Sequence, residues 1–237
     1  MYDIKLNKTV VQNHIRYDWW KYVLLVIFTI LIWNGVTSYK INKAIPQDER
    51  MEVFLVGDYI YEDNTEEISI KIMESMEGLQ KLDFIGIPMN PFEYQQRQMQ
   101  GLTQEEPREE DQFMLDPQTD MAGQQKLMVM IGSQSGDIFI FEEDMYKLYA
   151  EQGAFMDIAD YIKNMDPSLI DIEDLEDLKV ASEEDETAKQ YGLPADSIKA
   201  FEGTGYNVEG KVISIMAYSK KPDKAWAVMK WLLEGNK

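Results

Sequence analysis

The stretch that decides the fold is SGDIFIFEEDMYKLYAEQGAF, residues 135–155. Residues 138–141 form a short apolar run, which is typical of a buried strand. Acidic residues follow directly, and a helical pattern then continues to Gly153, a residue type that often ends helices. A strand followed at once by a helix is the building unit of an α/β protein. The stretch carries no obvious reactive group, so we interpret it as scaffold.

The segments around this stretch continue the alternation. Residues 51–59 and 81–89 have the pattern of strands, whereas residues 116–132 and 222–235 have the periodicity of helices. Nearly continuous apolar residues in 51–59 suit a sheet covered on both faces. Strands and helices at these separations predict βαβ crossovers and a largely parallel sheet flanked by helices. In residues 116–132 we expect four apolar side chains to face the core: Leu127, Met128, Met130 and Ile131.

Two segments are expected to depart from this pattern. Residues 92–118 are rich in Gln and Glu and contain two prolines, which predicts a flexible, solvated insertion with one short strand near residues 113–115. Residues 196–201 and 211–218 flank the turn sequence GTGY, and we interpret them as a hairpin. Residues 211–218 are also the candidate for a strand that runs antiparallel to the sheet.

The charge of the chain is strongly negative and unevenly distributed. The 237 residues have a formal net charge of −20. Residues 1–50 contain seven basic and four acidic residues, so the remaining chain holds a net charge of −23. An acidic body repels phosphate groups, and we therefore expect no nucleic acid among the partners. The chain has no cysteine, which excludes disulfides and Cys-ligated zinc.

The strongest physical signal is WWKYVLLVIFTILIWNGVTSY, residues 19–39. It has about the length needed to cross the hydrocarbon core of a bilayer, and aromatic residues lie at both ends, as in an interfacial belt. We predict a cytoplasmic arm over residues 1–18, a transmembrane helix over residues 19–39 and a linker over residues 40–50. The alternative is a cleaved secretory signal with residues 22–33 as its apolar part.

Basic residues before the apolar segment favour a cytoplasmic N-terminus: Lys5, Lys8, Arg16 and Lys21. The acidic domain, residues 51–237, is then expected outside the cytoplasm, with the lipid bilayer contacted through residues 19–39. This topology separates His14, the single histidine, from the domain. A histidine-based catalytic or metal site within the domain is thereby excluded for one chain.

Enzymatic motifs are also missing from the domain. The sequence GSQSG, residues 132–136, lacks the lysine and the spacing of a phosphate-binding loop. The acidic sequence DIEDLEDL, residues 171–178, lacks the glycine and the ligand spacing of a calcium loop. We therefore expect no catalytic residue, no metal site and no cofactor.

Three stretches resemble extracellular solute-binding proteins of bacterial ABC importers. QQKLMVMIGSQSGDIFIFEEDMYKLYAEQGAFMDIADYI is similar to the central signature of their first lobe. YGLP, residues 191–194, is similar to a YGIP segment, and AYSKKPDKAWAVMKWLLE resembles their closing motif. The resemblance covers roughly residues 51–237 and implies an α/β fold like that of a single periplasmic-binding-protein-like lobe. The anchored form most resembles proteins of Gram-positive bacteria.

The departures from that family limit what the resemblance implies. Full members have two lobes that close over a ligand. Here about 60 residues separate Phe155 from Ala217, which leaves no room for a second α/β lobe. The lipid-attachment cysteine is also absent. The resemblance therefore implies the fold of a first lobe, without trap closure.

A ligand site is expected where the carboxyl ends of the strands meet, because open α/β sheets bind ligands there. Tyrosine rings at these ends suit stacking on a sugar or aromatic ring, and carboxylates suit hydroxyl groups. The ligand-binding candidates are Asp58, Tyr59, Tyr61, Asn90, Glu142, Glu143, Asp144 and Tyr218. The three acids Glu142, Glu143 and Asp144 have a simpler interpretation, because acidic residues are favoured at helix N-termini.

Two functions fit these observations. The first is a membrane-anchored, non-catalytic solute-binding-like receptor or accessory component of an ABC-type transporter. Its partners would be a small solute (a sugar or peptide) and a membrane permease. The second is an interaction module that keeps the fold, has lost the ligand site and binds another cell-surface protein. A receptor predicts an open pocket lined by Tyr59, Asn90 and Tyr218, and an interaction module predicts that this pocket is filled or covered.

Overall fold

The structure, a computed structural model, describes residues 8–60, 64–99, 114–163, 165, 172–182 and 185–235. The chain forms two compact units, Met1–Pro46 and Gln47–Lys237. The first described element, α1 (Lys8–Ala44), belongs to the first unit, and all other elements belong to the second.

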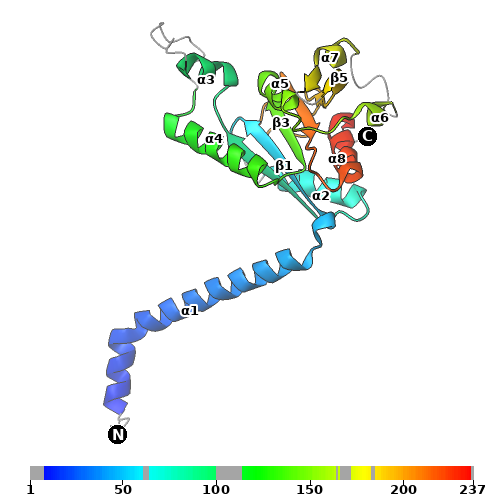
Figure 1. Cartoon of the computed structure of the whole chain (residues 1–237). Coiled ribbons are helices and arrows are strands. Elements are labelled where there is room, and N and C mark those ends of the chain that lie inside the picture. The colour runs from blue at the N-terminus through cyan, green and yellow to red at the C-terminus, as the bar shows by residue number, and fades with distance from the viewer. Residues whose placement is uncertain are drawn as a thin grey trace. The chain divides into compact units, whose positions relative to one another are not determined.

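The first unit contains one long helix, drawn in blue in Figure 1. Its segment Arg16–Thr37 has a mean hydropathy of 1.6, and none of it is buried. Within the apolar run, the Thr29 hydroxyl donates a hydrogen bond to the Leu25 carbonyl at 2.8 Å. By length and composition this helix is able to cross a bilayer, although a signal sequence has the same properties. It continues to Ala44 and so includes part of the predicted linker.

The second unit is built on a five-stranded sheet with the strand order β2-β1-β3-β7-β6. The strands are β1 (Arg50–Gly57), β2 (Lys81–Pro88), β3 (Ile138–Glu142), β6 (Gly192–Pro194) and β7 (Lys211–Ile215). A separate hairpin consists of β4 (Lys179–Ser182) and β5 (Asp185–Gln190). The helices are η1 (Gln47–Glu49), α2 (Glu66–Ser75), α3 (Phe92–Met99), α4 (Pro117–Gly132), α5 (Glu143–Glu151), α6 (Ala159–Ile162), α7 (Ile172–Asp177) and α8 (Pro222–Glu234).

The sheet is mostly parallel, as the sequence predicts. Strand β1 runs parallel to both β2 and β3. Strand β7 runs antiparallel to β3 on one side and to β6 on the other, so it alone has the opposite direction among these five strands. The antiparallel orientation proposed for residues 211–218 is therefore confirmed.

Helices cover both faces of the sheet, and Figure 1 shows the sheet between α4 and α8. The alternation of side chains along β1 explains this arrangement. Val53 and Leu55 point to one face, where they join a core with residues of α2 and α8. Phe54 and Val56 point to the other face, where they join a core with residues of α4 and α5. The expectation of a doubly covered strand from the continuous apolar run is confirmed.

The predicted hairpin between residues 196–201 and 211–218 is wrong. Strand β7 pairs instead with β6, and residues 196–201 form turns. Phe201 lies in the core, with its ring edge-on to Phe84 at 5.5 Å between centroids and to Tyr206 at 5.8 Å. These apolar residues therefore anchor a loop to the core, which the sequence pattern alone does not distinguish from a strand.

The predicted insertion over residues 92–118 is helical at both described ends. Residues 100–113 lie outside the described residues, so flexibility there stays a prediction. Helix α3 takes up the first part, and α4 begins at Pro117. Asp116 caps α4 by accepting hydrogen bonds from the backbone N–H groups of Gln118 and Thr119, both at 3.1 Å. Leu115 lies in an irregular segment, which excludes it from the predicted short strand.

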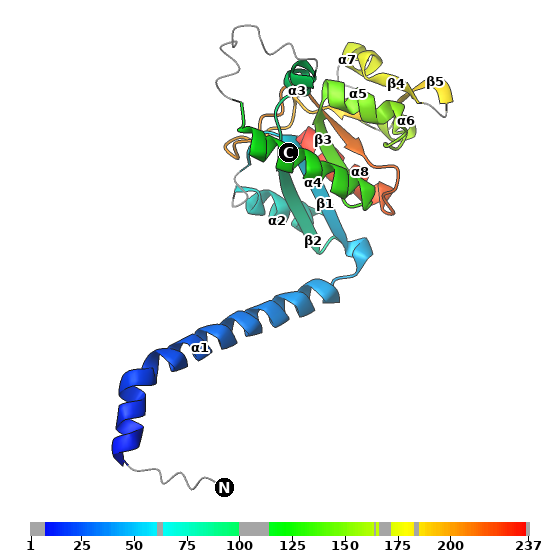
Figure 2. The same ribbon diagram turned by 60° about the vertical axis from the view of Figure 1, so that its left-hand side comes forward.

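Helix α4 packs very closely against β2, and the turned view of Figure 2 shows the two together. A Cβ atom on Gly123 would lie 2.0 Å from the carbonyl oxygen of Pro88, so only glycine fits there. Leu127 is buried, as predicted, but Met128 is 65% exposed. The five consecutive apolar residues 127–131 cover more than one face of a helix, since each residue turns by about 100°. The predicted inward orientation is therefore wrong for Met128, whereas Met130 and Ile131 are half-buried and pack against the core.

We expect Gly123→Ala to lower the free energy of unfolding by about 1–3 kcal/mol, because the added methyl group overlaps backbone atoms of β2. Gly132→Ala in the same helix is the matched control, since a methyl group added there would have no atom within 4 Å. The control should be neutral or slightly stabilising, because alanine favours helix. Chemical denaturation followed by circular dichroism measures both variants. Equal destabilisation of the two would contradict the close contact.

Candidate functional site

The candidate site lies at the carboxyl ends of β1 and β3. Because β7 is antiparallel to β3, its first residue lies at this same edge, and Lys211 pairs in register with Glu142. Asp58, the residue after β1, forms an ion pair with Lys211. Two predicted acids and one lysine are thus gathered where parallel strands end.

Lys211 is the central residue of this edge. Its side chain is only 5% exposed, whereas that of Asp58 is 45% exposed. The Lys211 ammonium lies 4.1 Å from the ring centroid of Tyr206, a favourable cation–π distance. Asp58 also accepts a hydrogen bond from the backbone N–H of Asn207 at 3.3 Å. A buried ammonium requires such partners, because burying an uncompensated charge is costly.

Hydrogen bonds hold the phenol ring of Tyr206 against the Lys211 ammonium. Its hydroxyl donates a hydrogen bond to the Val56 carbonyl at 2.9 Å, and the Ile140 carbonyl lies 3.3 Å away. Burial raises the pKa of Tyr206 well above its ordinary value, and the negative charges of Asp58 and Glu142 raise it further. The hydroxyl therefore stays protonated and ties β1 and β3 to the loop that precedes β7.

A cavity of about 280 Å³ opens beside Lys211. It is bounded by the start of α5, the end of α7, β6 and the start of β7. The described lining residues are Glu143, Asp177, Leu178, Pro194, Asp196, Gly210, Lys211 and Val212. Two of its acids already have partners, since Glu143 pairs with Lys147 at 2.5 Å and Asp196 accepts from the Gly210 N–H at 3.0 Å. The cavity thus offers carboxylate acceptors and a small apolar surface, whereas the Lys211 ammonium is directed to Asp58 and the ring of Tyr206.

The predicted ligand-binding acids are distributed unequally around this cavity. Glu143 lines it, whereas Asp58 does not line it and pairs with the Lys211 ammonium. The Glu142 carboxylate instead accepts a hydrogen bond from the Phe92 backbone N–H at 3.0 Å and so holds the start of α3. Asp144 is exposed in the first turn of α5, where acidic residues are favoured, and does not line the cavity.

The predicted aromatic and amide residues do not form a common pocket in the part of the chain that the structure describes. Tyr59 follows β1 and is 64% exposed. Tyr61 lies outside the described residues. Asn90 is buried, and its side chain both accepts from the Leu115 N–H at 2.7 Å and donates to the Leu115 carbonyl at 3.3 Å. Asn90 therefore positions the segment before α4.

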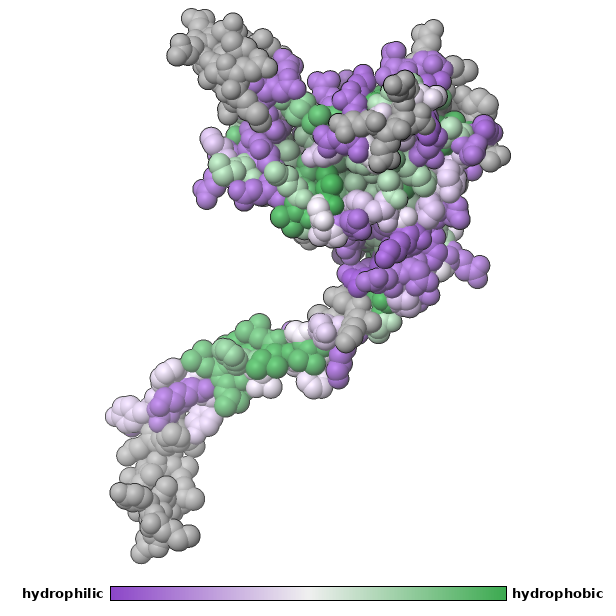
Figure 3. Space-filling view, viewed as in Figure 1, coloured by the Kyte–Doolittle hydropathy of each residue, from purple (hydrophilic) through white to green (hydrophobic). Residues whose placement is uncertain are grey.

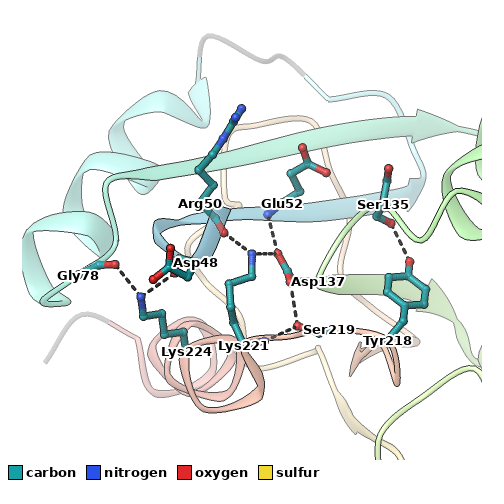
Figure 4. A network of polar contacts seen from close by, with 10 residues as sticks. All are labelled: Asp48, Arg50, Glu52, Gly78, Ser135, Asp137, Tyr218, Ser219, Lys221 and Lys224. Carbon is teal, nitrogen blue, oxygen red and sulfur yellow. Dashed lines mark hydrogen bonds and ion pairs between the residues drawn. The ribbon is translucent and has the colours of Figure 1, made fainter. Parts of the chain in front are cut away.

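The placement of Tyr218 at the carboxyl edge is wrong. Since β7 runs antiparallel, residues after β7 lie at the amino ends of β1 and β3. The Tyr218 hydroxyl donates to the Ser135 carbonyl, just before β3, at 2.7 Å (Figure 4). Burial raises the pKa of Tyr218, and the charge of Asp137 adds to this effect. Tyr218 is a structural residue of the opposite edge.

A polar network at this amino edge explains the closing motif AYSKKPDKAW, as Figure 4 shows. Asp137 accepts from Ser219 at 2.8 Å and pairs with Lys221 at 2.9 Å. Lys221 also donates to the Arg50 carbonyl at the start of β1. One turn into α8, Lys224 donates to the carbonyls of Asp48 and Gly78 at 2.6 and 2.8 Å. The motif thus attaches the start of α8 to the sheet and has no direct part in the cavity.

Sequence reasoning missed the residues that complete the carboxyl edge. Lys211, Tyr206, Asp177 and Asp196 are not among the sequence candidates, although three of them line the cavity. The sequence signal for Lys211 is its position directly before the apolar run VISI. A residue at the start of a buried strand can itself be buried, as Lys211 is. Among the described residues, no group of three or more Asp, Glu or His side chains is placed to hold a metal ion.

No family model and no curated protein matches the chain. Similar solved structures include an ABC substrate-binding protein from Listeria monocytogenes in complex with cycloalternan, at 17% identity and a TM-score of 0.37. They also include an ABC transporter associated binding protein from B. animalis subsp. lactis in complex with beta-1,6-galactobiose, at 16% identity and a TM-score of 0.34. The matches cover 60% and 63% of this chain, but only 28% and 26% of those proteins.

We expect stability to fall as the pH rises above about 10, the pKa of tyrosine in an unfolded chain. Because the folded pKa of Tyr206 is raised, its contribution is complete below that pH and is lost as the pH rises toward the folded pKa. Tyr206→Phe should therefore lose stability less steeply, by up to about 1.4 kcal/mol per pH unit. Denaturant unfolding at several alkaline pH values measures the slopes. Tyr59→Phe, at an exposed tyrosine, should leave the slope unchanged.

A second prediction concerns the amino-edge network. Asp137→Asn should reduce the free energy of unfolding by about 1–3 kcal/mol, because Lys221 is only 14% exposed and loses its charged partner. The control is Asp160→Asn, which breaks the fully exposed pair with Lys163. It should have no measurable effect in the same denaturation experiment. Similar results for the two variants would show that the network does not attach α8.

Proposed function

We propose that this protein is a membrane-anchored, extracytoplasmic and non-catalytic solute-binding-like protein. It acts as a receptor or accessory component beside an ABC-type transporter. The observation that carries the proposal is the cavity beside Lys211, at the carboxyl edge of a mostly parallel sheet. This is the edge at which open α/β sheets bind ligands. The motif resemblance of residues 135–155 and 191–194 to the first lobe of solute-binding proteins supports the same assignment.

The chemistry of the cavity fits a small polar solute. Carboxylates of Asp177 and Asp196 accept hydrogen bonds from hydroxyl or amino groups of a solute. Leu178 and Pro194 provide apolar contact for a ring or an aliphatic chain. A volume of about 280 Å³ lies just below the usual range for small-molecule sites. We therefore infer that the cavity holds one sugar ring or one peptide side chain.

We expect a partner protein to supply the second wall of the ligand site, which a single lobe lacks. One wall buries about half of a ligand at best, so the affinity of the isolated domain is expected to be weak. A permease or another membrane protein that faces the carboxyl edge would contribute the second wall. In this proposal residues 19–39 of α1 cross the lipid bilayer, residues 1–18 are cytoplasmic and residues 51–237 lie outside. Confinement to the same membrane then brings the two walls together.

A specific observation favours the second candidate function, a cell-surface interaction module. The Asn90 side chain is hydrogen-bonded to the backbone of Leu115, and Tyr218 lies at the opposite edge of the sheet. The pocket expected for a receptor is therefore not formed by Tyr59, Asn90 and Tyr218. Lys211 is also already paired with Asp58. An acidic surface that binds another protein needs no cavity. The two candidates differ in whether a small solute stabilises the fold.

A thermal-shift screen of the full chain against sugars, oligosaccharides, peptides and amino acids distinguishes the two functions. A ligand at a hundred times its dissociation constant should add about 2.7 kcal/mol to the free energy of unfolding. Asp196→Asn combined with Asp177→Asn should remove the shift, because both acids line the cavity. Glu74→Gln, on the exposed face of α2, is the control. No shift with any compound would favour the interaction module.

A further inference from the structure

Helix α4 directs both of its charged residues inward and three of its large apolar residues outward. Its two charged residues, Asp120 and Lys126, both contact the domain. Asp120 accepts a hydrogen bond from the Asn90 backbone N–H at 2.8 Å, and Lys126 donates to the Gly86 carbonyl at 2.9 Å. The outward face of α4 is therefore without charge. This is the reverse of the usual pattern for a surface helix.

The outward face is both apolar and exposed. Met121, Met128 and Val129 are 59%, 65% and 61% exposed. In Figure 3, which has the view of Figure 1, hydrophobic surface appears where Figure 1 places α4. Ala122 and Gln125, which lie between them, and Gly132, which follows them, are exposed and uncharged as well. An exposed face that gathers apolar side chains without charge is a candidate interaction site.

Other helices of the domain show that this face is exceptional. Exposed charged residues occur on α2, α5 and α8, for example Glu74, Asp144 and Asp223. The whole chain carries a formal net charge of −20. Two copies of so acidic a protein repel each other over most of their surface. At a face without charge, such as that of α4, two copies meet with less repulsion than at a charged face.

We propose that α4 docks on α4 of a second copy of this chain, with the two helices antiparallel about a two-fold axis near Gln125. Met121, Gln125, Met128 and Gly132 follow at spacings of four, three and four residues, the seam of a helix pair. A two-fold axis places Met121 of one copy against Met128 and Val129 of its partner. The Gln125 amide has both a donor and an acceptor, so two such amides at the axis satisfy each other.

The size of the face fits an association that depends on the membrane. Three exposed side chains and their neighbours bury a few hundred Å² per copy, less than the roughly 800 Å² per partner of a stable complex. Confinement of both copies to one bilayer raises their effective concentration and compensates for this difference. The inference therefore rests on the proposed anchoring through α1.

The absence of cysteine allows a direct test by single-cysteine crosslinking. The full chain with Gln125→Cys is reconstituted in lipid vesicles, oxidised and analysed on a non-reducing gel. We expect a crosslinked dimer, because residues at the axis approach within the reach of a disulfide. Glu74→Cys on the exposed face of α2 is the control and should give little dimer. Equal crosslinking of the two variants would overturn the proposal.

Two further variants test the geometry of the contact. Adding Val129→Asp to the Gln125→Cys chain should lower dimer formation about tenfold, because it brings carboxylates into the neutral seam. Val129 is exposed, so the substitution should not unfold the domain. A mixture of Met121→Cys and Val129→Cys chains should crosslink to each other, whereas Met121→Cys alone should not. Self-crosslinking of Met121→Cys above the Glu74→Cys level would contradict the antiparallel arrangement.

Vesicle flotation separates this inference from the proposed anchoring. Chains that float with the vesicles are anchored, whatever their crosslinking. Floating Gln125→Cys chains without dimer overturn the α4 contact and leave the anchoring intact. Chains that do not float contradict the anchoring, and with it the membrane-dependent association proposed here.

Discussion

The direction of β7 determines which residues meet at each edge of the sheet. Because β7 is antiparallel to β3, its first residue, Lys211, lies at the carboxyl edge and its last residues lie at the amino edge. At the carboxyl edge a nearly buried ammonium is held between Asp58 and the ring of Tyr206. Burying a charge without partners is costly, so this group of side chains is mutually dependent. Lys211 is also one of the residues that line the cavity.

The amino edge depends on the same strand in a different way. The residues after β7 carry Ser219 and Lys221 to Asp137, the residue just before β3. This polar network fixes the start of α8, which covers one face of the sheet. A motif that resembles the closing sequence of solute-binding proteins is thus explained by its structural role. Its polar residues stabilise the fold and are remote from the proposed ligand.

Local sequence patterns predicted most helices and strands correctly. The main wrong predictions concern which strands pair with one another, which depends on contacts between distant segments. Residues 138–141 and 211–215 are apolar runs, and both are strands. No local pattern shows that β7 pairs with β6 instead of residues 196–201, because Ile198 and Phe201 are as apolar as a strand and yet anchor a loop. Tyr218 was misplaced because the end of its strand was grouped with the carboxyl ends of the parallel strands, although an antiparallel strand ends at the opposite edge. At the site, acids after strands were predictable, whereas the importance of Lys211 depends on contacts with Asp58 and Tyr206 from distant segments.

The contact between Lys126 and Gly86 has a consequence for the behaviour of the protein at high concentration. Strand β2 is the last strand of its sheet among the described residues, and its outer backbone groups are a template for a strand of another molecule. The Lys126 ammonium donates a hydrogen bond to the Gly86 carbonyl of this strand. Pro88, the last residue of the strand, has no N–H to donate. A charged side chain and a proline are two means by which natural proteins prevent sheet-to-sheet polymerisation. The helix that leaves its own outer face exposed thus protects one edge of the sheet, strand β2, from pairing with another molecule.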